Sequence, residues 1–271
     1  MSELLSFIKA GRKPVIGMVQ LRPLAGSCRY GGGRIESVLD SAFEEAEALS
    51  AYEIDALMVQ NLGDLPVANH AATAQVAWMT RVTSEIRQRF GRPVGLNLLE
   101  NDAEAMFAVA SAASADFVRI KVFIGAMMTP FGMETAQCHA AIRARSAADA
   151  GNIAIFADVH DRTGTPIGST GFEEDLLFAT RLGGADGLVL TGKSYQQTLD
   201  YLAIARKASP HVPILVGGGV NDANFAEVTK TADGVIVSSA LKNSADAFGK
   251  FDREKIASFM GAVQRVRTLS Q

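Results

Sequence analysis

The sequence has few of the residues that mark disulfide-bonded and zinc-dependent proteins. Its 271 residues include two cysteines, four histidines and one tryptophan. Cys28 and Cys138 are too few for a disulfide framework and favour a reducing compartment, so we expect a cytoplasmic protein. Only one of the four histidines, His160, lies at a predicted strand end, and zinc catalysis generally uses more imidazole ligands than one, so no metal site is expected.

Long apolar runs and a strong net charge are missing as well. The longest run of small apolar residues, 105–115, is too short for a membrane span, and the N-terminal segment 1–9 carries an early acid and too short an apolar run for a signal peptide. The formal net charge is −3, with 20% charged residues. Nothing therefore favours nucleic acid or an anionic membrane as a partner, and a soluble protein is predicted.

What the sequence does contain is an alternation of strand-like and helix-like patterns, repeated eight times. Strands are expected at 15–19, 56–59, 94–98, 117–122, 153–158 and 187–190, with a seventh in 213–220 and an eighth in 232–242. Helices are expected at 35–51, 69–90, 102–112, 134–150, 172–182, 194–208 and 253–266, with caps at Asp102, Asn221 and Asp222. Such alternation favours parallel βαβ units, and the length suits a single (β/α)₈ TIM-barrel domain over residues 1–271.

The residues that precede the strands repeat with every second strand. The first, third and seventh strands follow prolines, Pro14, Pro93 and Pro213, whereas the fifth follows Asn152. The four even-numbered strands follow aspartates: Asp55, Asp116, Asp186 and Asp233. Proline is tolerated at the first position of a strand, and aspartate is expected to bond nearby backbone. A repeated βαβα quarter fits a barrel whose alternate strands fill alternate core layers.

Two glycine- and serine-containing turns follow the seventh and eighth strands. Glycines at 217–219 allow backbone N–H groups to come close to a ligand, and Ser238 and Ser239 add hydroxyl donors ahead of a helix. Two consecutive turns of this kind are typical of the phosphate site of a TIM barrel. We therefore predict a phosphate site at Gly218, Gly219, Ser238 and Ser239. The alternative is that the glycines only make a tight turn.

Long loops mark the end of the barrel where chemistry is expected. The loops at 21–34, 123–133 and 159–171 follow strands, and the catalytic face of this fold lies at the strand C-termini. Polar residues at these strand ends are expected to meet a ligand, solvent or one another. Predicted substrate-binding residues are Gln20, Asn61, Asp64, Asn97, Arg119 and Lys193. Predicted catalytic residues are Lys121, Asp158, Glu100 and His160.

Lys121 is the leading catalytic candidate. It shares strand parity with Arg119, so both side chains are expected to face the same way and to share the barrel mouth with Asp158 and Glu100. A desolvated lysine beside another cation has a lowered pKa and can form a Schiff base or act as an acid or base. The alternative is that Lys121 only pairs with Asp158. Lys193 is a second lysine candidate, although an exposed lysine is the commoner outcome at a helix start.

No cofactor is predicted. Asp158 and His160 share parity and offer a pair of metal ligands, and magnesium on carboxylates and a substrate phosphate is an alternative without a motif. A Gly-x-Ser-x-Gly nucleophile elbow is absent from the sequence. The glycines at 31–33 follow no dinucleotide-type strand and are expected to form a loop.

The segment 15–30, VIGMVQLRPLAGSCRY, resembles the opening motif of the BtpA family, also called BtpA/SgcQ. The family typically has Gly-x-x-His-Leu-x-Pro-Leu-Pro-Gly-Ser-Pro at this point. The likeness continues over nearly the whole chain, at 61–64, 99–102, 117–120, 125–126, 157–159, 191–192, 215–220 and 232–234. The resemblance implies a phosphate-binding TIM barrel. The family is named for a cyanobacterial photosystem I biogenesis factor, and other members accompany sugar-metabolism genes.

The chain departs from the family pattern at positions that bear on catalysis. Gln20 replaces the family histidine, Ala25 and Cys28 replace two prolines, and Lys121 stands where asparagine is usual. The segment 160–163 has a different order of charged residues. The resemblance therefore implies the scaffold and the phosphate site, and leaves the possibility that Lys121 supplies what a histidine supplies elsewhere.

Three functions are consistent with these residues. The first is a lyase of aldolase type or an isomerase that acts on a small phosphorylated sugar or sugar-derived metabolite, held by its phosphate. The second is a metal-assisted hydrolase or transferase acting on a nucleoside or glycoside through Asp158, His160 and Glu100. The third is a non-catalytic assembly factor. Because polar groups gather at the barrel mouth, an enzyme is preferred, and a homo-oligomer is expected by analogy with other barrels.

Overall fold

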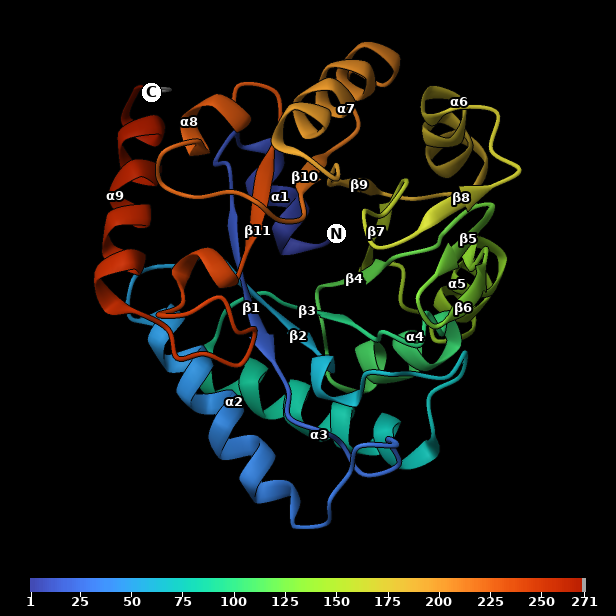
Figure 1. Ribbon diagram of the computed structural model, residues 1–271, viewed down its shortest axis with the longest axis vertical. Helices are drawn as coiled ribbons and strands as arrows, with labels where there is room; N and C mark the ends of the chain where they lie inside the picture. The colour runs from blue at the N-terminus through green and yellow to red at the C-terminus, as the bar shows by residue number, and fades with distance from the viewer. Residues whose placement is uncertain (270–271) are drawn as a thin grey trace.

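The computed structural model describes residues 1–269, which form a closed barrel of eight parallel strands (Figure 1). Along the chain these are β1 (Val15–Gln20), β2 (Ala56–Gln60), β3 (Val94–Asn97), β4 (Phe117–Ile120), β7 (Ala154–Asp158), β9 (Gly187–Leu190), β10 (Ile214–Val216) and β11 (Gly234–Val237). The first strand pairs with both β2 and β11, which closes the ring. The predicted (β/α)₈ TIM barrel is thereby confirmed.

Helices alternate with the strands and surround them. They are α1 (Glu3–Lys9), α2 (Ile35–Ser50), α3 (Thr73–Phe90), α4 (Ala103–Ala112), α5 (Cys138–Ala147), α6 (Phe172–Leu177), α7 (Tyr195–Ala208), α8 (Phe225–Val228) and α9 (Arg253–Leu269). Short helical turns are η1 (Leu62–Asp64), the π-type η2 (Phe178–Leu182) that continues α6, and η3 (Ser239–Leu241). None of the helices within residues 1–269 combines the length and hydropathy that a membrane crossing requires.

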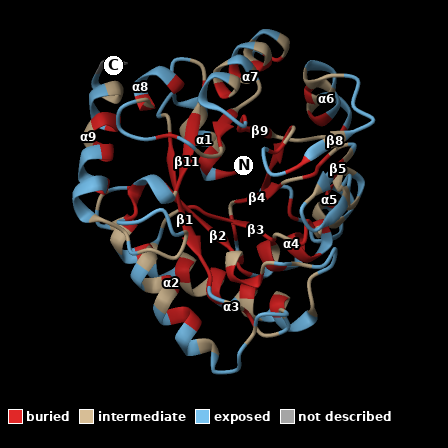
Figure 2. Ribbon diagram, viewed as in Figure 1, coloured by how far each residue is buried: buried red, intermediate tan, exposed pale blue. Residues whose placement is uncertain are grey.

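Two apolar layers account for the burial pattern in Figure 2, where the strands of the barrel are buried and the outer helix faces are exposed. Side chains such as Val19, Leu57 and Ile120 pack outward against the helices. Met58, Phe117 and Phe156 point into the barrel, where the two phenyl rings meet edge to face with centroids 5.8 Å apart. Alternate side chains of a strand therefore serve different layers, as expected for strands that are buried on both faces.

The aspartates that precede the even-numbered strands join neighbouring strands at the bottom of the barrel. Asp55 accepts a hydrogen bond from the N–H of Val15 at 2.8 Å, so the start of β2 is tied to the start of β1. In the same way Asp186 accepts from Ile155 at 2.8 Å, and Asp233 accepts from Ile214 at 2.9 Å. These aspartates were expected to close turns through backbone near them in the sequence, but they bond the backbone of the preceding strand, 19 to 40 residues away. Their period of two strands follows because each of the three joins a pair of strands.

Asp116 has a different partner, the N-terminal helix. Its carboxylate accepts hydrogen bonds from the Ser2 hydroxyl and from the N–H groups of Glu3 and Leu4, at 2.7 to 2.9 Å. Leu4 is fully buried among the inward-facing side chains of the barrel, and α1 lies near the centre of the ring of strands in Figure 1. The helix therefore closes one end of the barrel and leaves the other end open.

One predicted helix is wrong in its first part. Instead of a helix from residue 134, the chain forms two strands, β5 (Ala126–Thr129) and β6 (Gly132–Thr135), before α5 begins. With β8 (Thr165–Ile167) they form a three-stranded antiparallel sheet, the lid sheet, in the order β6-β5-β8. Along β5 the side chains alternate, with Met127 buried and Met128 exposed, which is the period of a strand.

Smaller differences concern helix ends. Asp102 caps α4 as predicted, accepting the N–H of Ala105 at 3.0 Å. Helix α3 begins after the predicted residue 69, so His70 lies before it. Asn224, rather than the predicted caps, is the N-cap residue of α8: Asn221 bonds nearby loop N–H groups, and Asp222 bonds the Ser258 hydroxyl.

Candidate functional site

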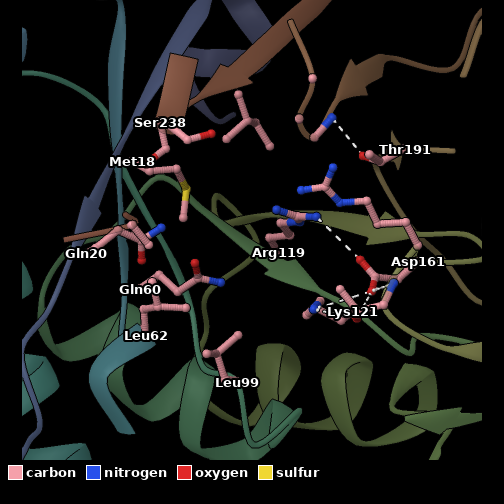
Figure 3. Close-up of a pocket in the computed structure, with 18 of the residues that line it drawn as sticks. Met18, Gln20, Gln60, Leu62, Leu99, Arg119, Lys121, Asp161, Thr191 and Ser238 are labelled. Carbon is pink, nitrogen blue, oxygen red and sulfur yellow. Dashed lines mark hydrogen bonds and ion pairs between the residues drawn. The ribbon is translucent and has the colours of Figure 1, made fainter. Parts of the chain in front are cut away.

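A cavity of about 990 Å³ lies at the C-terminal ends of the barrel strands, the end opposite α1 (Figure 3). Its floor is formed by residues of several strands or strand ends: Met18, Gln20, Gln60, Arg119 and Thr191. The turns after β10 and β11 form one side, and the lid sheet covers another. A cavity of this size is at the upper end of what small-molecule sites occupy, about 300–1,000 Å³.

The turn after β10 is shaped by glycine. A Cβ at Gly217 would lie 2.7 Å from the Thr191 hydroxyl and 3.0 Å from Nη2 of Arg119, so only glycine allows the chain this close to those groups. Gly219 has a φ of 77°, and a Cβ there would meet nothing within 4 Å. Gly218 and Gly219 both line the cavity, so backbone without side chains borders it here.

Ser238 and Ser239 line the same side of the cavity, at the end of β11. The helix expected after them is reduced to the three residues of η3, and α8 after the glycine turn has only four. Neither is long enough to contribute a substantial helix dipole. Any anion on this side would therefore depend on individual N–H and hydroxyl groups and on nearby cations.

Arg162 supplies such a cation, and the sequence reasoning did not single it out. Its Nη2 lies 3.5 Å from the position that a Cβ of Gly218 would occupy, so the guanidinium reaches across the mouth to the glycine turn. Arg162 lines the cavity and makes no hydrogen bond or ion pair with any residue of the described chain. An unpaired arginine beside a glycine turn is well suited to an oxyanion.

Arg119 and Asp158 form a buried ion pair. Nε and Nη2 of Arg119 donate to the two carboxylate oxygens of Asp158, each at 2.7 Å. Burial disfavours the arginine charge, but the carboxylate more than compensates and the pKa of Arg119 is raised. Arg119 lines the cavity, whereas Asp158 lies behind it. Asp158, predicted as catalytic, is thus placed to hold Arg119 in position.

Lys121 lies at the cavity wall on the same side as Arg119 (Figure 3), directly after β4, which ends at Ile120 and not at the predicted residue 122. Its Nζ lies 3.2 Å from the Thr163 hydroxyl and 3.4 Å from Oδ1 of Asp161. Burial tends to raise the pKa of Asp161, but Lys121 and Arg119 together lower it, so this carboxylate is ionised. The alternative, that Lys121 pairs with Asp158, is not realised: Arg119 occupies that carboxylate, and Lys121 pairs with Asp161 instead.

Asn101 fixes the chain beside Lys121. Its side-chain oxygen accepts the N–H of Val122 at 3.0 Å, and its amide nitrogen donates to the carbonyl of Val122 at 3.2 Å. Asn101 itself has a φ of 54°, a left-handed conformation that asparagine tolerates better than most residues. The two bonds hold the segment that leaves β4, and hence the backbone from which Lys121 projects.

A chain of amides determines which atom of Gln60 faces the cavity. Nδ2 of Asn97 donates to the carbonyl of Arg119 at 2.8 Å, so Oδ1 of Asn97 must accept, and it does so from Nε2 of Gln60 at 2.5 Å. Oε1 of Gln60 is consequently left as an acceptor at the cavity. Gln20 is the cross-strand neighbour of Gln60, and its buried Oε1 has no partner within residues 1–269.

Three further predicted residues form a buried network behind the cavity wall. Nδ2 of Asn61 donates to Asp64 and to Glu100, and Nε2 of Gln75 donates to the same two carboxylates. The pKa of Glu100 is raised, chiefly by burial, although the bond from Asn61 acts in the opposite direction. Asn61, Asp64 and Glu100 are each at most 1% exposed and do not line the cavity.

His160 and Lys193 also lie away from the cavity. His160 has a φ of 54°, which turns it toward α6, where its Nε2 lies 2.7 Å from Oδ2 of Asp175 and its ring packs against Phe172. Lys193 is exposed before α7, and only its backbone is bonded, to Gln197. Within the described chain, no group of three His, Cys, Asp or Glu side chains is arranged to hold a metal ion.

Glu134 is a second residue of the site that the sequence reasoning missed. It lies on β6 opposite Met127, and the side chains of this pair line the cavity while those of Met128 and Met133 face outward. Burial raises the pKa of Glu134, and the charge of Lys121 acts to lower it. The only available signal was the alternation of 126–129, which was too short to distinguish a strand from a loop.

Comparison with known proteins gives a consistent family relationship. A model of the BtpA family matches residues 11–265. An uncharacterized protein of Thermococcus kodakarensis is 35% identical over 96% of this chain and 98% of its own length. The photosystem I biogenesis protein BtpA of Synechocystis is 32% identical, over 92% and 88% respectively. The putative sgc region protein SgcQ of Escherichia coli is 25% identical, over 94% and 96%.

Similar solved structures are TIM barrels of low sequence identity. An N-(5'-phosphoribosyl)anthranilate isomerase from Pyrococcus furiosus has a TM-score of 0.56 at 17% identity, covering 94% of this chain and 100% of that one. A tryptophan synthase from M. tuberculosis has a TM-score of 0.60 at 16% identity, covering 97% and 100%. At these identities the likeness establishes the fold and nothing about the reaction.

Proposed function

This chain belongs to the BtpA family, and we propose that it is an enzyme that acts on a small phosphorylated sugar or sugar-derived metabolite, as a lyase of aldolase type or an isomerase. One observation carries the proposal: unpaired Arg162 reaches the glycine turn at Gly218, inside a cavity that Ser238 and Ser239 also line. This side suits a phosphate dianion, because an unpaired guanidinium, two serines and a glycine turn line it together. Phosphate-ester enzymes among the similar barrels are consistent with it.

Lys121 is the proposed catalytic residue, on the wall below the lid sheet. Its ammonium group forms an ion pair with the carboxylate of Asp161, 3.4 Å away, which holds it at the cavity wall. An ammonium group is suited to donate a hydrogen bond or proton to a substrate carbonyl oxygen, and less suited to attack the carbonyl carbon. Of the two reactions proposed, this environment favours acid–base isomerisation over a Schiff-base lyase.

The uncharged part of the ligand is proposed to contact Gln60 and Gln20. Oε1 of Gln60 is an acceptor directed into the cavity, and the buried Oε1 of Gln20 has no partner within residues 1–269. Buried acceptors require donors, and hydroxyl groups of a sugar chain supply them. This pair of amides supports a hydroxylated ligand in preference to an apolar phosphate ester.

The experiment is a thermal-shift series that compares sugar phosphates with their unphosphorylated parents, with and without Mg²⁺. A ligand at about 100 times its Kd adds about 2.7 kcal/mol to the free energy of unfolding, and for a chain of this size that raises Tm by about 5–10 °C. Arg162→Met should remove most of the shift, whereas Lys193→Met, which removes an exposed lysine outside the cavity, should not. Equal shifts with phosphorylated and parent sugars would contradict the proposal.

A non-catalytic assembly role is the second candidate, and the lid sheet favours it. The outer side chains Met128, Met133 and Ile167 are 51%, 53% and 43% exposed, which is unusual for large apolar residues on neighbouring strands. The relative in Synechocystis is named for photosystem I biogenesis. The metal-assisted hydrolase gains no such support, because Asp158 and His160 are engaged by Arg119 and Asp175.

A further inference from the structure

An isomerase or aldolase-type lyase has to move a proton to or from a substrate carbon, and Lys121 accounts for only one of the two groups required. While Lys121 interacts with the carbonyl oxygen, a separate base must take the proton from the adjacent carbon. A carboxylate that faces the cavity, and whose oxygens are not already held by hydrogen bonds or ion pairs, is suited to act as this base. The following inference rests on the proposed function, since it concerns the same cavity and the same class of substrate.

The buried carboxylates near the cavity are engaged by other groups. Asp158 accepts both donors of Arg119, and Glu100 accepts from Asn61 and Gln75. Glu45 accepts from Lys242 at 2.6 Å and from the backbone N–H of Gln20 at 2.8 Å. A carboxylate that is fixed by such bonds behind the cavity wall cannot approach a ligand carbon.

Two carboxylates line the cavity itself, Asp161 and Glu134. Oδ1 of Asp161 accepts the N–H and the hydroxyl of Thr163, and Oδ2 lies 3.9 Å from Nη2 of Arg119. Lys121 and Arg119 lower the pKa of this carboxyl, so it is a weak base. Within residues 1–269 the carboxylate of Glu134 makes no hydrogen bond or ion pair, and only its backbone is paired, with Met127 in the lid sheet. Of the two, Glu134 has its oxygens free for a substrate.

The lid sheet fixes Glu134 on the side of the cavity where Lys121 lies. Glu134 is the cross-strand neighbour of Met127 on β5, and β5 pairs on its other edge with β8. The loop that leads into β8 carries Thr163, whose hydroxyl lies 3.2 Å from Nζ of Lys121. The same small sheet therefore carries Glu134 and is joined to the loop that contacts Lys121, and the charge of Lys121 is close enough to act on the pKa of Glu134.

We propose that Glu134 is the general base of this site and that the lid sheet carries it to the substrate. Its carboxylate takes the proton from the carbon next to the substrate carbonyl, and the electrons of that C–H bond form the double bond of an enediol. The ammonium group of Lys121 gives its proton to the carbonyl oxygen. Glu134 then returns a proton to the former carbonyl carbon, and the hydroxyl group on the other carbon of the enediol gives its proton to Lys121. The carbonyl has moved to that other carbon, and the isomerisation needs no further reactant.

The test is proton exchange at carbon in heavy water, measured by NMR with dihydroxyacetone phosphate and ribulose phosphate as probes. The wild-type protein should exchange the C–H hydrogen next to the carbonyl. Glu134→Gln should lower the exchange rate by about 10²–10⁴-fold, the usual contribution of a general base. Its thermal shift with the same probes should persist, and Glu134→Asp should recover part of the rate.

Met133→Gln is the matched control, because it places the same side chain on the same strand but on the outer face. It should leave exchange unchanged. Exchange in Glu134→Gln at the wild-type rate, or its absence from wild-type protein that binds the probes, would overturn the role of Glu134 and leave phosphate binding intact. Absence of any thermal shift with phosphorylated probes would instead overturn the proposed function.

The wild-type exchange rate should also rise with pH through the pKa of Glu134, which lies above the ordinary value of 4.5, and Glu134→Gln should lack this rise.

Discussion

Two buried carboxylates, Asp158 and Glu100, differ in what neutralises them. Asp158 faces a guanidinium at 2.7 Å, whereas Glu100 receives only neutral amide donors and lies close enough to Asp64 for that charge to raise its pKa. Protonation of Asp158 would leave the buried guanidinium of Arg119 without its counter-charge, whereas protonation of Glu100 leaves no cation unpaired. Both residues were predicted to be catalytic from their places at strand ends, and the structure gives both a supporting position.

Glu100 makes the stability of the protein depend on pH. Because its pKa is raised on folding above the ordinary value of 4.5, the folded chain binds its proton more tightly than the unfolded chain. This contribution to stability is fully present below pH 4.5 and is lost as the pH rises through the folded pKa. Wild type loses this contribution as the pH rises, and Glu100→Gln has no such group to titrate. Measured in urea titrations, the free energy of unfolding of Glu100→Gln should therefore increase relative to that of wild type from pH 5 to pH 7.5. An equal difference between the two proteins at both pH values would contradict this account.

The Arg119–Asp158 pair should show strong coupling. Removing one partner leaves the other charge buried without compensation, so Arg119→Met and Asp158→Leu should each lower the free energy of unfolding by about 3–5 kcal/mol. The double variant should lose less than the sum of the two, since no unpaired charge remains. Urea denaturation of the four proteins measures the coupling, and additive losses would mean that the two side chains do not act as a pair.

At the scale of elements, the barrel was predictable and the lid sheet was not. The strands of the barrel are buried on both faces and read as apolar runs such as ILV at 214–216, and each is punctuated by proline, aspartate or glycine. The lid strands have three or four residues each and expose one face, so their pattern is too short to be recognised. The turn between Thr129 and Gly132 joins β5 to β6. The alanine-rich segment that follows has a helical pattern, and this made the predicted helix begin too early, at Glu134.

The N-terminal helix provides a test of how the closed end of the barrel is held. Asp116→Ala removes the acceptor of the first N–H groups of α1, and a loss of about 1–2 kcal/mol is typical for a helix cap. Hydrogen exchange of α1 amides should quicken more than exchange of the barrel strands. Asp186→Ala is the control, because it removes the carboxylate that accepts the N–H of Ile155 on β7 without touching α1. Equal protection of α1 in both variants would show that burial of Leu4 alone fixes the helix.

At the scale of the whole molecule, the site is assembled from segments that are distant in the sequence. The glycine and serine turns lie close together in the chain, and this is why a phosphate site was predicted from local patterns. Arg162 and Glu134 reach the cavity only because the barrel closes and the lid sheet folds over its mouth, and neither has a local motif. Residues whose role depends on closure in this way are beyond prediction from periodicity.

Closure also predicts that a ligand at one part of the ring stabilises the whole ring. Trp78, the single tryptophan, lies on α3 and packs against Tyr30 with ring centroids 5.5 Å apart, whereas the proposed phosphate side follows β10 and β11. Because β1 pairs with both β2 and β11, the N-terminal and C-terminal strands share hydrogen bonds and should unfold together. Urea unfolding followed by Trp78 fluorescence and by far-UV circular dichroism should give coincident transitions, and a sugar phosphate that binds should shift both equally.

If the ligand moved the circular dichroism transition and left the fluorescence transition in place, the two halves of the barrel would be unfolding separately. The β1–β11 pairing would then contribute little to cooperativity.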